Sequence, residues 1–377
     1  MTENFNIPRK ALYLAWLFIG IGLLALVYGF ISDTSRLFPV LLLNNFYFLS
    51  ISLGAVFFIA LQHVTDSGWS VMFQRIPEAM ASYVPVGFLV MFVFLFGIGE
   101  IYEWAQPGIT ETDPLIDHKS PYLNVPFFYV RLILVFLAWM LLIFLMRRNS
   151  LRGYSNRHLS QVFIFVFAIT FTVASFDWIM SIDAHWFSTL FGIRAIISSL
   201  YYAVAVIILV VIFLNRTGYL KALNKYHMND FGRYLFRLSI VFGYLWFMQY
   251  LIIWYANIPE TTFYYVYRVN EPWAFLFYSE LIINWTIPFI VLMADDIARR
   301  KAVLIPISFL LLTGFYLSLY LQIMPGSYGE LNFGFIEIGS FAGFAGVFIL
   351  LFTRSLSRVP FLAENHPYFK ESIGHHL

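Results

Sequence analysis

The sequence contains no cysteine and few charged side chains, and both absences restrict what the protein can do. Without cysteine, the chain cannot form a disulfide, bind an iron–sulfur cluster through thiolates or attach c-type haem through a C-x-x-C-H motif. Asp, Glu, Lys and Arg make up only 12% of the 377 residues, against about 25% in soluble domains. So few charges cannot cover a water-exposed surface, which excludes an ordinary soluble globular protein.

Apolar and aromatic residues are abundant instead. Hydrophobic residues make up 60% of the chain and aromatic residues 20%, with a mean hydropathy of +0.76. This much buriable surface excludes a disordered chain. No basic patch with interleaved aromatic residues is present, so nucleic acid is not an expected partner. The composition predicts an integral membrane protein surrounded by lipid.

Ten apolar runs have the length of about 20 residues that a helix needs to cross a bilayer. They lack the short alternating segments of a membrane barrel. The first run is too long for a signal peptide and has no cleavage site of small residues, so we expect it to be retained. The sequence predicts an all-α protein with one polytopic domain over 1–377. The runs cover 11–31, 39–63, 79–99, 126–146, 158–180, 187–214, 234–257, 273–294, 302–324 and 332–353.

The distribution of basic residues predicts the orientation in the membrane. Most Lys and Arg residues fall in the loops on the side of the two termini, whereas the opposite loops carry only Arg36, Lys119 and Arg268. The positive-inside rule places the richer side in the cytoplasm. We therefore expect both termini, including a tail over 354–377, to be cytoplasmic. The opposite side is acidic, above all over 100–119.

Loop lengths suggest an internal repeat. Long loops at 100–125 and 258–272 are each followed, one helix later, by a short basic loop, at 147–157 and 295–301. This pattern predicts two four-helix bundles, over 39–180 and 187–324, flanked by the first and last helices. A chance coincidence of loop lengths is the alternative interpretation.

Several ionisable residues fall inside or beside the apolar runs, all in the outer half. Each charge at membrane depth costs about 2.5–3.5 kcal/mol on insertion scales, so each is a functional candidate. Arg194 is close enough in sequence to reach Asp177, and such a pair could equally lock two helices together. Glu280 has no partner nearby in sequence and is expected to face an interior cavity or to carry a raised pKa. The predicted proton path consists of Asp177, Asp183, His185, Arg194, Glu280, Arg131 and Glu337.

Aromatic and histidine residues give weaker candidates. Trp254, Tyr255 and Asn257 lie just before Pro259 and could contact a quinone head group, although their position equally suits anchors at the membrane interface. The lone histidines at span ends, such as His63, are a poor signal for haem. No metal site is predicted.

Four stretches carry a resemblance to a known family: LLLNNFYFLSISLGAVFFIALQHVTDSGW (41–69), SFDWIMSIDAHWFSTLFG (175–192), QYLIIWYANIPETTFYY (249–265) and NWTIPFIVLMADDIARRK (284–301). Together with the C-terminal ENHPYFKESIGHHL, they resemble the ActF subunits of bacterial alternative complex III. The resemblance runs over nearly the whole chain. That family is similar to the NrfD/PsrC type of quinone-interacting membrane subunit, whose fold is two four-helix bundles.

The resemblance implies a place in a respiratory complex of the bacterial inner membrane. Such a complex oxidises menaquinol or ubiquinol near the outer face and passes electrons through the iron–sulfur subunit ActB to cytochrome c subunits, then to a terminal oxidase or soluble carrier. ActF and its paralogue ActC form the membrane core. Iron–sulfur clusters and haems belong to partner subunits, so no covalently bound cofactor is expected here. No catalytic residue is carried over from the family.

Two other functions remain open at this point. A secondary transporter would suit ten spans and a same-orientation repeat, but the sequence shows no spans broken by Gly or Pro at corresponding positions of the two halves. A passive scaffold for lipids and other subunits is the second alternative.

Overall fold

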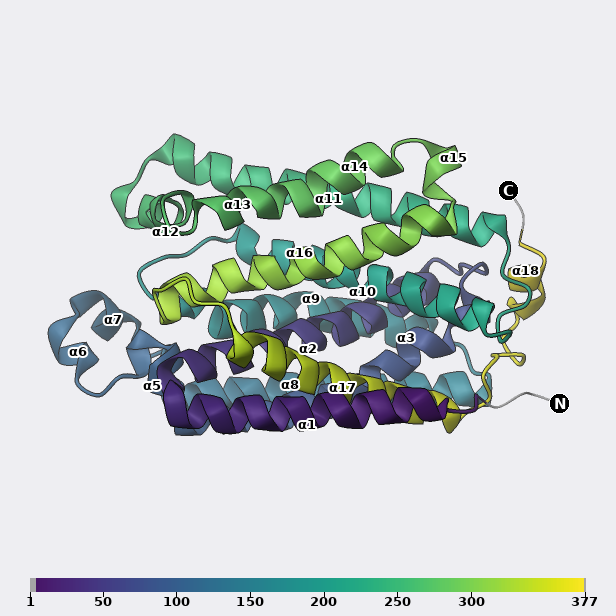
Figure 1. Ribbon diagram of the computed structural model, residues 1–377, viewed down its shortest axis with the longest axis horizontal. Coiled ribbons are helices and arrows are strands. Elements are labelled where there is room, and N and C mark those ends of the chain that lie inside the picture. Colours follow the sequence, from purple (N-terminus) through teal and green to yellow (C-terminus); the bar gives the residue numbers. More distant parts are fainter. Residues whose placement is uncertain (1–4, 376–377) are drawn as a thin grey trace.

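The computed structural model describes residues 5–375 and is helical throughout, with no β-strand in that range (Figure 1). Ten of its helices are long and apolar enough to cross a membrane. Each coincides with one predicted run, although individual ends shift, in the largest case from 234 to Lys225. The multi-pass character predicted from hydropathy is therefore confirmed.

Eight spans are built on single long helices, and two are interrupted. The long helices are α1 (Arg9–Ser32), α2 (Thr34–Val64), α8 (Val125–Arg152), α9 (Arg157–Trp178), α10 (Leu190–Arg216), α11 (Lys225–Ala256), α16 (Lys301–Ser327) and α17 (Phe335–Ser357). The third span, Val71–Phe96, consists of η1 (Val71–Phe73), α3 (Arg75–Met80), η2 (Ala81–Tyr83), α4 (Val84–Val93) and η3 (Phe94–Phe96). The eighth, Ala274–Leu292, consists of α13 (Ala274–Leu281), the π-helix η6 (Ile282–Thr286) and α14 (Ile287–Leu292).

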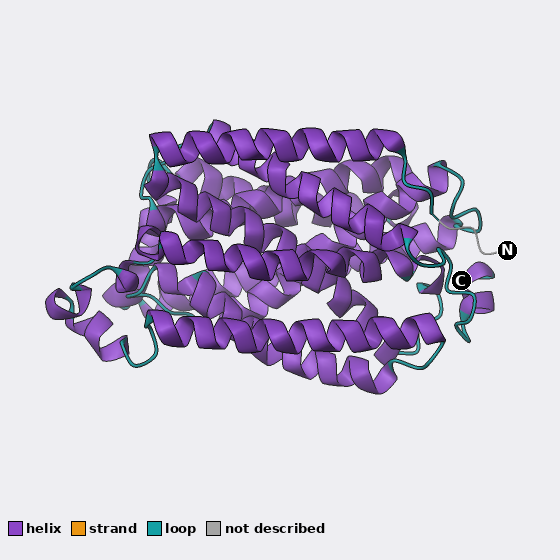
Figure 2. Ribbon diagram, turned by 90° about the horizontal axis from the view of Figure 1, so that it is seen from below, coloured by secondary structure: helices purple, strands orange, loops and turns teal. Residues whose placement is uncertain are grey.

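The remaining short elements lie in the connections, at the end of the fifth span (η5) and in the C-terminal segment (α18). They are α5 (Ile98–Ile101), η4 (Glu103–Ala105), α6 (Ile109–Thr112), α7 (Pro114–Lys119), η5 (Met180–Ile182), α12 (Pro259–Val269), α15 (Asp295–Ala298) and α18 (Phe369–Ile373). Figures 1 and 2 show that α6 and α7 form a lobe that projects beyond the helices. We call residues 97–124 the outer lobe.

Helix α2 is the centre of the molecule and is buried along nearly its whole length. It packs against α9, α10, α16 and α17. The approach to α10 depends on Gly54, because a Cβ there would lie 2.0 Å from the carbonyl oxygen of Ser199. Helix α1, by contrast, packs mainly along α17, where a Cβ on Gly22 would meet the Cα of Gly343 at 2.4 Å.

Proline accounts for the interruption of the eighth span. Pro288 has no amide hydrogen, so it cannot donate to the carbonyl oxygen of Asn284 as a regular α-helix would require. The hydroxyl of Tyr201, on α10, donates to that oxygen instead, at 3.1 Å. The preceding turn is the π-helix, a distortion that is frequent at functional sites.

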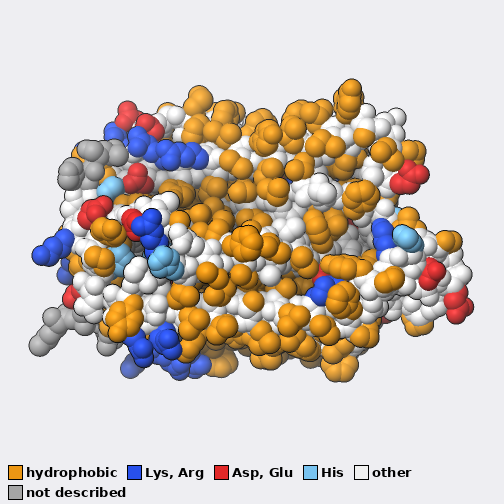
Figure 3. Space-filling view, turned by 180° about the vertical axis from the view of Figure 1, so that it is seen from behind, with side chains coloured by type: hydrophobic (Ala, Val, Ile, Leu, Met, Phe, Trp, Pro, Cys, Tyr) orange, Lys and Arg blue, Asp and Glu red, His pale blue; other side chains and the backbone are white. Residues whose placement is uncertain are grey.

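The two ends of the described chain meet at one end of the molecule. The amide of Asn6 donates to the hydroxyl of Tyr219, and the side-chain amide of Asn224 donates to the carbonyl of His375. We call this the terminal end, and the end with the outer lobe the opposite end. Figure 3 shows Lys and Arg gathered mostly at the terminal end, with a broad hydrophobic surface between the ends.

The C-terminal segment is folded back onto the spans at the terminal end. The hydroxyl of Ser372 donates to the carbonyl of Trp69 and accepts from the amide of Met72. The ring of His375 pairs with Asp230, 2.7 Å away. The predicted tail over 354–377 is thus a packed segment up to His375; its last two residues lie outside the described part of the chain.

Candidate functional site

Four ion pairs between an arginine and a carboxylate lie in the half of the molecule near the opposite end. Each joins two segments that are distant in sequence, and each uses a carboxylate singled out from the sequence. The pairs are Arg194–Glu280, Arg131–Asp177, Arg268–Asp183 and Arg36–Glu337. The structure therefore pairs every predicted carboxylate, but each with a partner that the sequence did not identify.

The Arg194–Glu280 pair is the most deeply enclosed of those inside the spans. Their side chains are 8% and 4% exposed, and the guanidinium lies 2.5 Å from Glu280 Oε1. Ser318 Oγ also donates to Oε1, at 2.6 Å, and Trp246 Nε1 donates to Oε2, at 3.0 Å. Arg194 donates further to Gln249 Oε1, at 3.3 Å. This cluster, the Glu280 cluster, unites α10, α11, α13 and α16.

Three polar atoms of this region are buried without a protein partner: Arg194 Nε, Gln249 Nε2 and the hydroxyl of Tyr202. Buried polar groups in proteins are nearly always hydrogen-bonded, and ordered water satisfies those that the chain does not. The Glu280 cluster therefore has free hydrogen-bonding capacity in the interior of the span region, as a route for protons would need.

The expected contact between Arg194 and Asp177 does not form. Arg194 faces α11, α13 and α16, whereas Asp177 accepts a 2.6 Å hydrogen bond from Arg131 on α8. The guanidinium of Arg131 also lies over the ring of Tyr122, at 3.9 Å. Burial raises the pKa of Tyr122 to about 12, and the charge of Asp177 adds to the rise. Tyr122 is thus a neutral phenol beside this ion pair.

Asp183 belongs to a tightly packed joint. Arg268 is 2% exposed and donates to Asp183 at 2.9 Å, to the carbonyl of Leu321 at 2.8 Å and to the carbonyl of Tyr264 at 3.0 Å. The ring of Tyr264 lies 3.5 Å below its guanidinium and stacks on Trp186 with ring centroids 3.8 Å apart. Arg268 therefore joins α12, α16 and the turn after α9.

His185 connects the same turn to the outer lobe. Its Nε2 lies 2.7 Å from Asp113 Oδ2, and Lys119 Nζ donates to the carbonyl of Ala184 at 2.6 Å. The amide of Ile116 lowers the pKa of Asp113, and hydrogen bonds from Leu115 and His185 lower it further. A charged Asp113 is the form that this contact favours.

Glu337 has a capping role at the start of α17. It accepts two hydrogen bonds from Arg36, at 2.7 and 2.6 Å, and one from the amide of Gly334, at 2.8 Å. A carboxylate in the first turn of a helix satisfies free amides there. Arg36, Lys119 and Arg268 are the three basic residues of the predicted outer loops. All three make contacts within the protein.

The predicted quinone contacts point outward. Trp254 and Tyr255 are 63% and 83% exposed. Asn257 is also exposed and ends α11 in a left-handed conformation, with φ of 48°. Aromatic side chains that face outward near the end of a span are typical of membrane-interface anchors. Their contact with a quinone stays a prediction.

A polar chamber at the terminal end was not expected from the sequence. A cavity of about 310 Å³ is lined by His63, Gln74, Arg157 and His366, among others, and a smaller one of about 20 Å³, reaching Glu78 and Arg147, adjoins it at His63. Burial lowers the pKa of His366, Glu78 opposes that shift, and Arg75 adds to it. We call the two cavities together the terminal chamber.

Glu78, which lines the smaller cavity, belongs to an ion-paired cluster. Arg75 lies 2.7 Å from Glu78, and Ser150 Oγ donates to Glu78 at 2.5 Å and accepts from Arg75 at 2.8 Å. The predicted third span began at 79, which left both charges in a loop, whereas the observed span begins at Val71.

The described residues contain no group of three or more His, Asp or Glu side chains arranged to hold a metal ion. His63 is bonded to Ser160 Oγ at 3.0 Å, and His158 is exposed. Comparison with known proteins finds no matching family model and no matching curated protein. The fold and the buried ion pairs define a multi-pass helical membrane protein with charged groups enclosed among its spans.

Proposed function

We propose that this chain is a membrane-core subunit of a quinol-oxidising respiratory complex, of the ActF type of alternative complex III, and that it supports quinol oxidation by handling protons near the outer face. The observation that carries the proposal is the Glu280 cluster. It encloses a carboxylate and an arginine beside buried polar atoms that have no hydrogen-bond partner in the protein. Charges are expensive at membrane depth, so their retention there favours a functional role over a passive one.

We assign the spans to the two bundles that the resemblance implies. In the first group, α2 packs against α9 and α3, and α8 packs against α9. In the second, α10 packs against α11 and α16, and α11 packs against α14, while α2 also packs closely on α10 and α16 across the two groups. Helices α1 and α17 pair beside the first group. The excess of Lys and Arg at the terminal end favours placing this end on the cytoplasmic side of a bacterial inner membrane.

The chemistry divides between this chain and its partners. Oxidation of a quinol yields the quinone, two electrons and two protons. This chain has no cysteine for an iron–sulfur cluster, so we assign the electrons to the ActB and cytochrome c partners, and the haems to those partners also. The protons need bases near the outer face, and we assign this role to Glu280 and Asp177, which lie toward the opposite end of the molecule.

A proton arriving at Glu280 would change the whole cluster. Neutralising the carboxylate would remove the counter-charge of Arg194 and leave a buried cation. Asp177 with Arg131 provides a second such pair, next to the neutral phenol of Tyr122. We assign proton uptake and release to these two pairs, which need no redox group in this chain.

The transporter alternative gains no support from the interrupted helices. If spans two to five correspond to spans six to nine, the broken third span corresponds to the seventh, which is one continuous helix, α11. The broken eighth span corresponds to α8, also continuous. Transporters of the inverted- or parallel-repeat type break equivalent helices in both halves.

The proposal is tested by purifying the tagged chain in mild detergent from the membranes of its own organism. We expect an ActC-like subunit, an iron–sulfur protein and c-type cytochromes in the mass spectrum, a haem absorption spectrum, and quinol-dependent reduction of an electron acceptor. Purification of the chain alone, with no haem spectrum and no quinol oxidation, would contradict the proposal and favour a scaffold or a transporter. Substrate uptake by proteoliposomes that hold only this chain would favour the transporter.

A further inference from the structure

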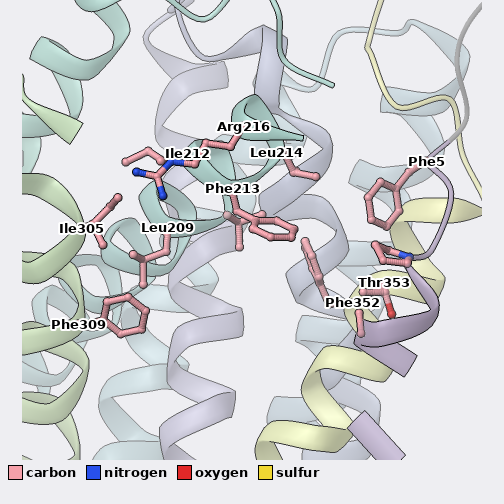
Figure 4. Close-up of a pocket in the computed structure, with 13 residues that line it drawn as sticks. Phe5, Leu209, Ile212, Phe213, Leu214, Arg216, Ile305, Phe309, Phe352 and Thr353 are labelled. Carbon is pink, nitrogen blue, oxygen red and sulfur yellow. The ribbon is translucent and has the colours of Figure 1, made fainter. Parts of the chain in front are cut away.

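A second cavity at the terminal end differs from the terminal chamber in being almost wholly apolar. It measures about 380 Å³ and lies where α10 and α16 face α17 and the start of α1 (Figure 4). Leu209, Phe213 and Phe309 line one side, and Phe5 and Phe352 the other. The cavity is open on one side, where Phe213 and Phe309 are 56% and 59% exposed.

The walls offer a ligand nothing but apolar contact. Thr353 is the one polar residue among them besides Arg216, and its hydroxyl donates at 2.7 Å to the carbonyl of Ile349 in its own helix. An uncharged aliphatic chain is what such a space accommodates best, because every polar group placed there would lose its hydrogen bonds to water.

Arg216 supplies a single cation to this cavity. It is exposed, it is the last residue of α10, and no carboxylate of the described residues lies within ion-pair distance of it. The side-chain oxygen of the neighbouring Asn215 accepts a 2.5 Å hydrogen bond from Lys301 Nζ. The guanidinium stands beside Leu209 and Ile305 in Figure 4. The cavity thus combines an apolar interior with one unpaired positive charge at the level where a span ends.

We propose that this cavity binds an anionic phospholipid, with an acyl chain among the aromatic and aliphatic side chains and the phosphate on Arg216. A phosphate would supply the negative charge that no carboxylate of the described residues provides to Arg216. Arginine binds phosphate oxygens with paired N–H donors. A quinone has the apolar tail but no negative charge. Arg216 lies at the end of a span, at the depth of lipid head groups. This assignment does not depend on the proposed function.

The test is native mass spectrometry of the purified chain, titrated with phosphatidylglycerol or with phosphatidylcholine of the same acyl chains. We expect phosphatidylglycerol to bind about fivefold more tightly to the wild type, the effect of one basic residue near an anionic head group. Arg216→Gln should remove the preference, and Arg216→Lys should keep most of it. Arg148→Gln, an exposed arginine at the same end but outside this cavity, should leave the preference unchanged.

A cavity-filling variant tests the apolar part separately. Ala11→Trp adds bulk from the α1 side without altering charge, and we expect it to weaken binding of both lipids at an unchanged melting temperature. Equal binding of the two lipids by the wild type would overturn the proposal, and so would equal losses in Arg216→Gln and Arg148→Gln. Menaquinone retained by the wild type, lost in Ala11→Trp and not displaced by phosphatidylglycerol, would assign the cavity to a quinone instead.

Discussion

The hydroxyl of Tyr201 donates a 3.1 Å hydrogen bond to the carbonyl oxygen of Asn284, the acceptor left without a regular helical partner by Pro288. Both groups are buried, so neither has bulk water as an alternative. The contact joins α10 to the π-helix that follows Glu280. It ties the helix that carries Arg194 to the span that carries Glu280.

Tyr201→Phe tests this contact. Removing the hydroxyl leaves a buried carbonyl unpaired, so we expect the free energy of unfolding to fall by about 1–3 kcal/mol. Tyr202→Phe is the matched control, since the neighbouring Tyr202 hydroxyl is buried without a protein partner and its removal should cost less. Thermal unfolding in detergent, followed by tryptophan fluorescence, measures both. Equal losses would mean that the bond to Asn284 contributes nothing specific.

The buried pair of Arg131 and Asp177 predicts strong coupling. Arg131→Leu should destabilise the protein by about 3–5 kcal/mol, because it leaves a carboxylate buried and unpaired. The double variant with Asp177→Leu should recover part of that loss. Arg157→Leu, which breaks a pair that is about half exposed with Asp66, should cost less than about 1 kcal/mol. Strictly additive effects of the Arg131 and Asp177 substitutions in the double variant would contradict the pairing.

Gly54 predicts a severe effect of a single methyl group. In Gly54→Ala, the new Cβ would meet the Ser199 carbonyl at 2.0 Å, so α2 and α10 would have to separate. We expect loss of folded protein in size-exclusion chromatography. Gly20→Ala is the control, because nothing lies within 4 Å of a Cβ at that position of α1. That variant should be neutral or slightly stabilising, as alanine favours a helix over glycine by about 0.5–1 kcal/mol. Similar behaviour of the two variants would rule out the close approach.

His366 predicts that acid loosens the C-terminal segment. Burial lowers its pKa, so the folded segment favours the neutral ring, whose Nδ1 accepts from the amide of Tyr368 at 3.3 Å. The stability that depends on this form is complete above the unfolded pKa of about 6.5 and is lost as the pH falls toward the lower folded value. Trypsin cleavage after Lys370, relative to a model peptide, should therefore be faster at pH 5.5 than at pH 7.5.

His366→Gln supplies the control for this pH dependence. A glutamine does not titrate in this range, so the ratio of cleavage rates at the two pH values should move toward that of the peptide. An unchanged ratio in this variant would assign the loosening to another group.

Hydropathy was sufficient to locate the ten spans, because a run of about 20 apolar residues has few other uses. It could not give the ion pairs. A helix that is apolar on all sides does not reveal which face turns toward which neighbour, so sequence proximity was the only guide. It suggested Arg194 with Asp177, whereas the actual partner of Arg194, Glu280, lies 86 residues away.

The terminal chamber escaped prediction for a related reason. Arg75 and Glu78 lie three residues apart and form an ion pair. Hydropathy counts each of them as a separate charge, so the apolar run predicted from it begins only after this stretch. The chamber itself depends on residues 366–368 folding back over α2 and the third span. No periodic pattern in the tail indicates such a contact.

The proposed role of Glu280 in carrying protons for quinol oxidation is tested most directly by the turnover of the assembled complex with Glu280→Gln. Glutamine keeps the size and can still accept from Ser318 and Arg194, but it cannot carry a proton. We predict a fall in quinol oxidation of about tenfold or more, at normal subunit content, with Glu103→Gln, an exposed outer-lobe carboxylate, unaffected. Wild-type turnover and proton release in Glu280→Gln would contradict the account.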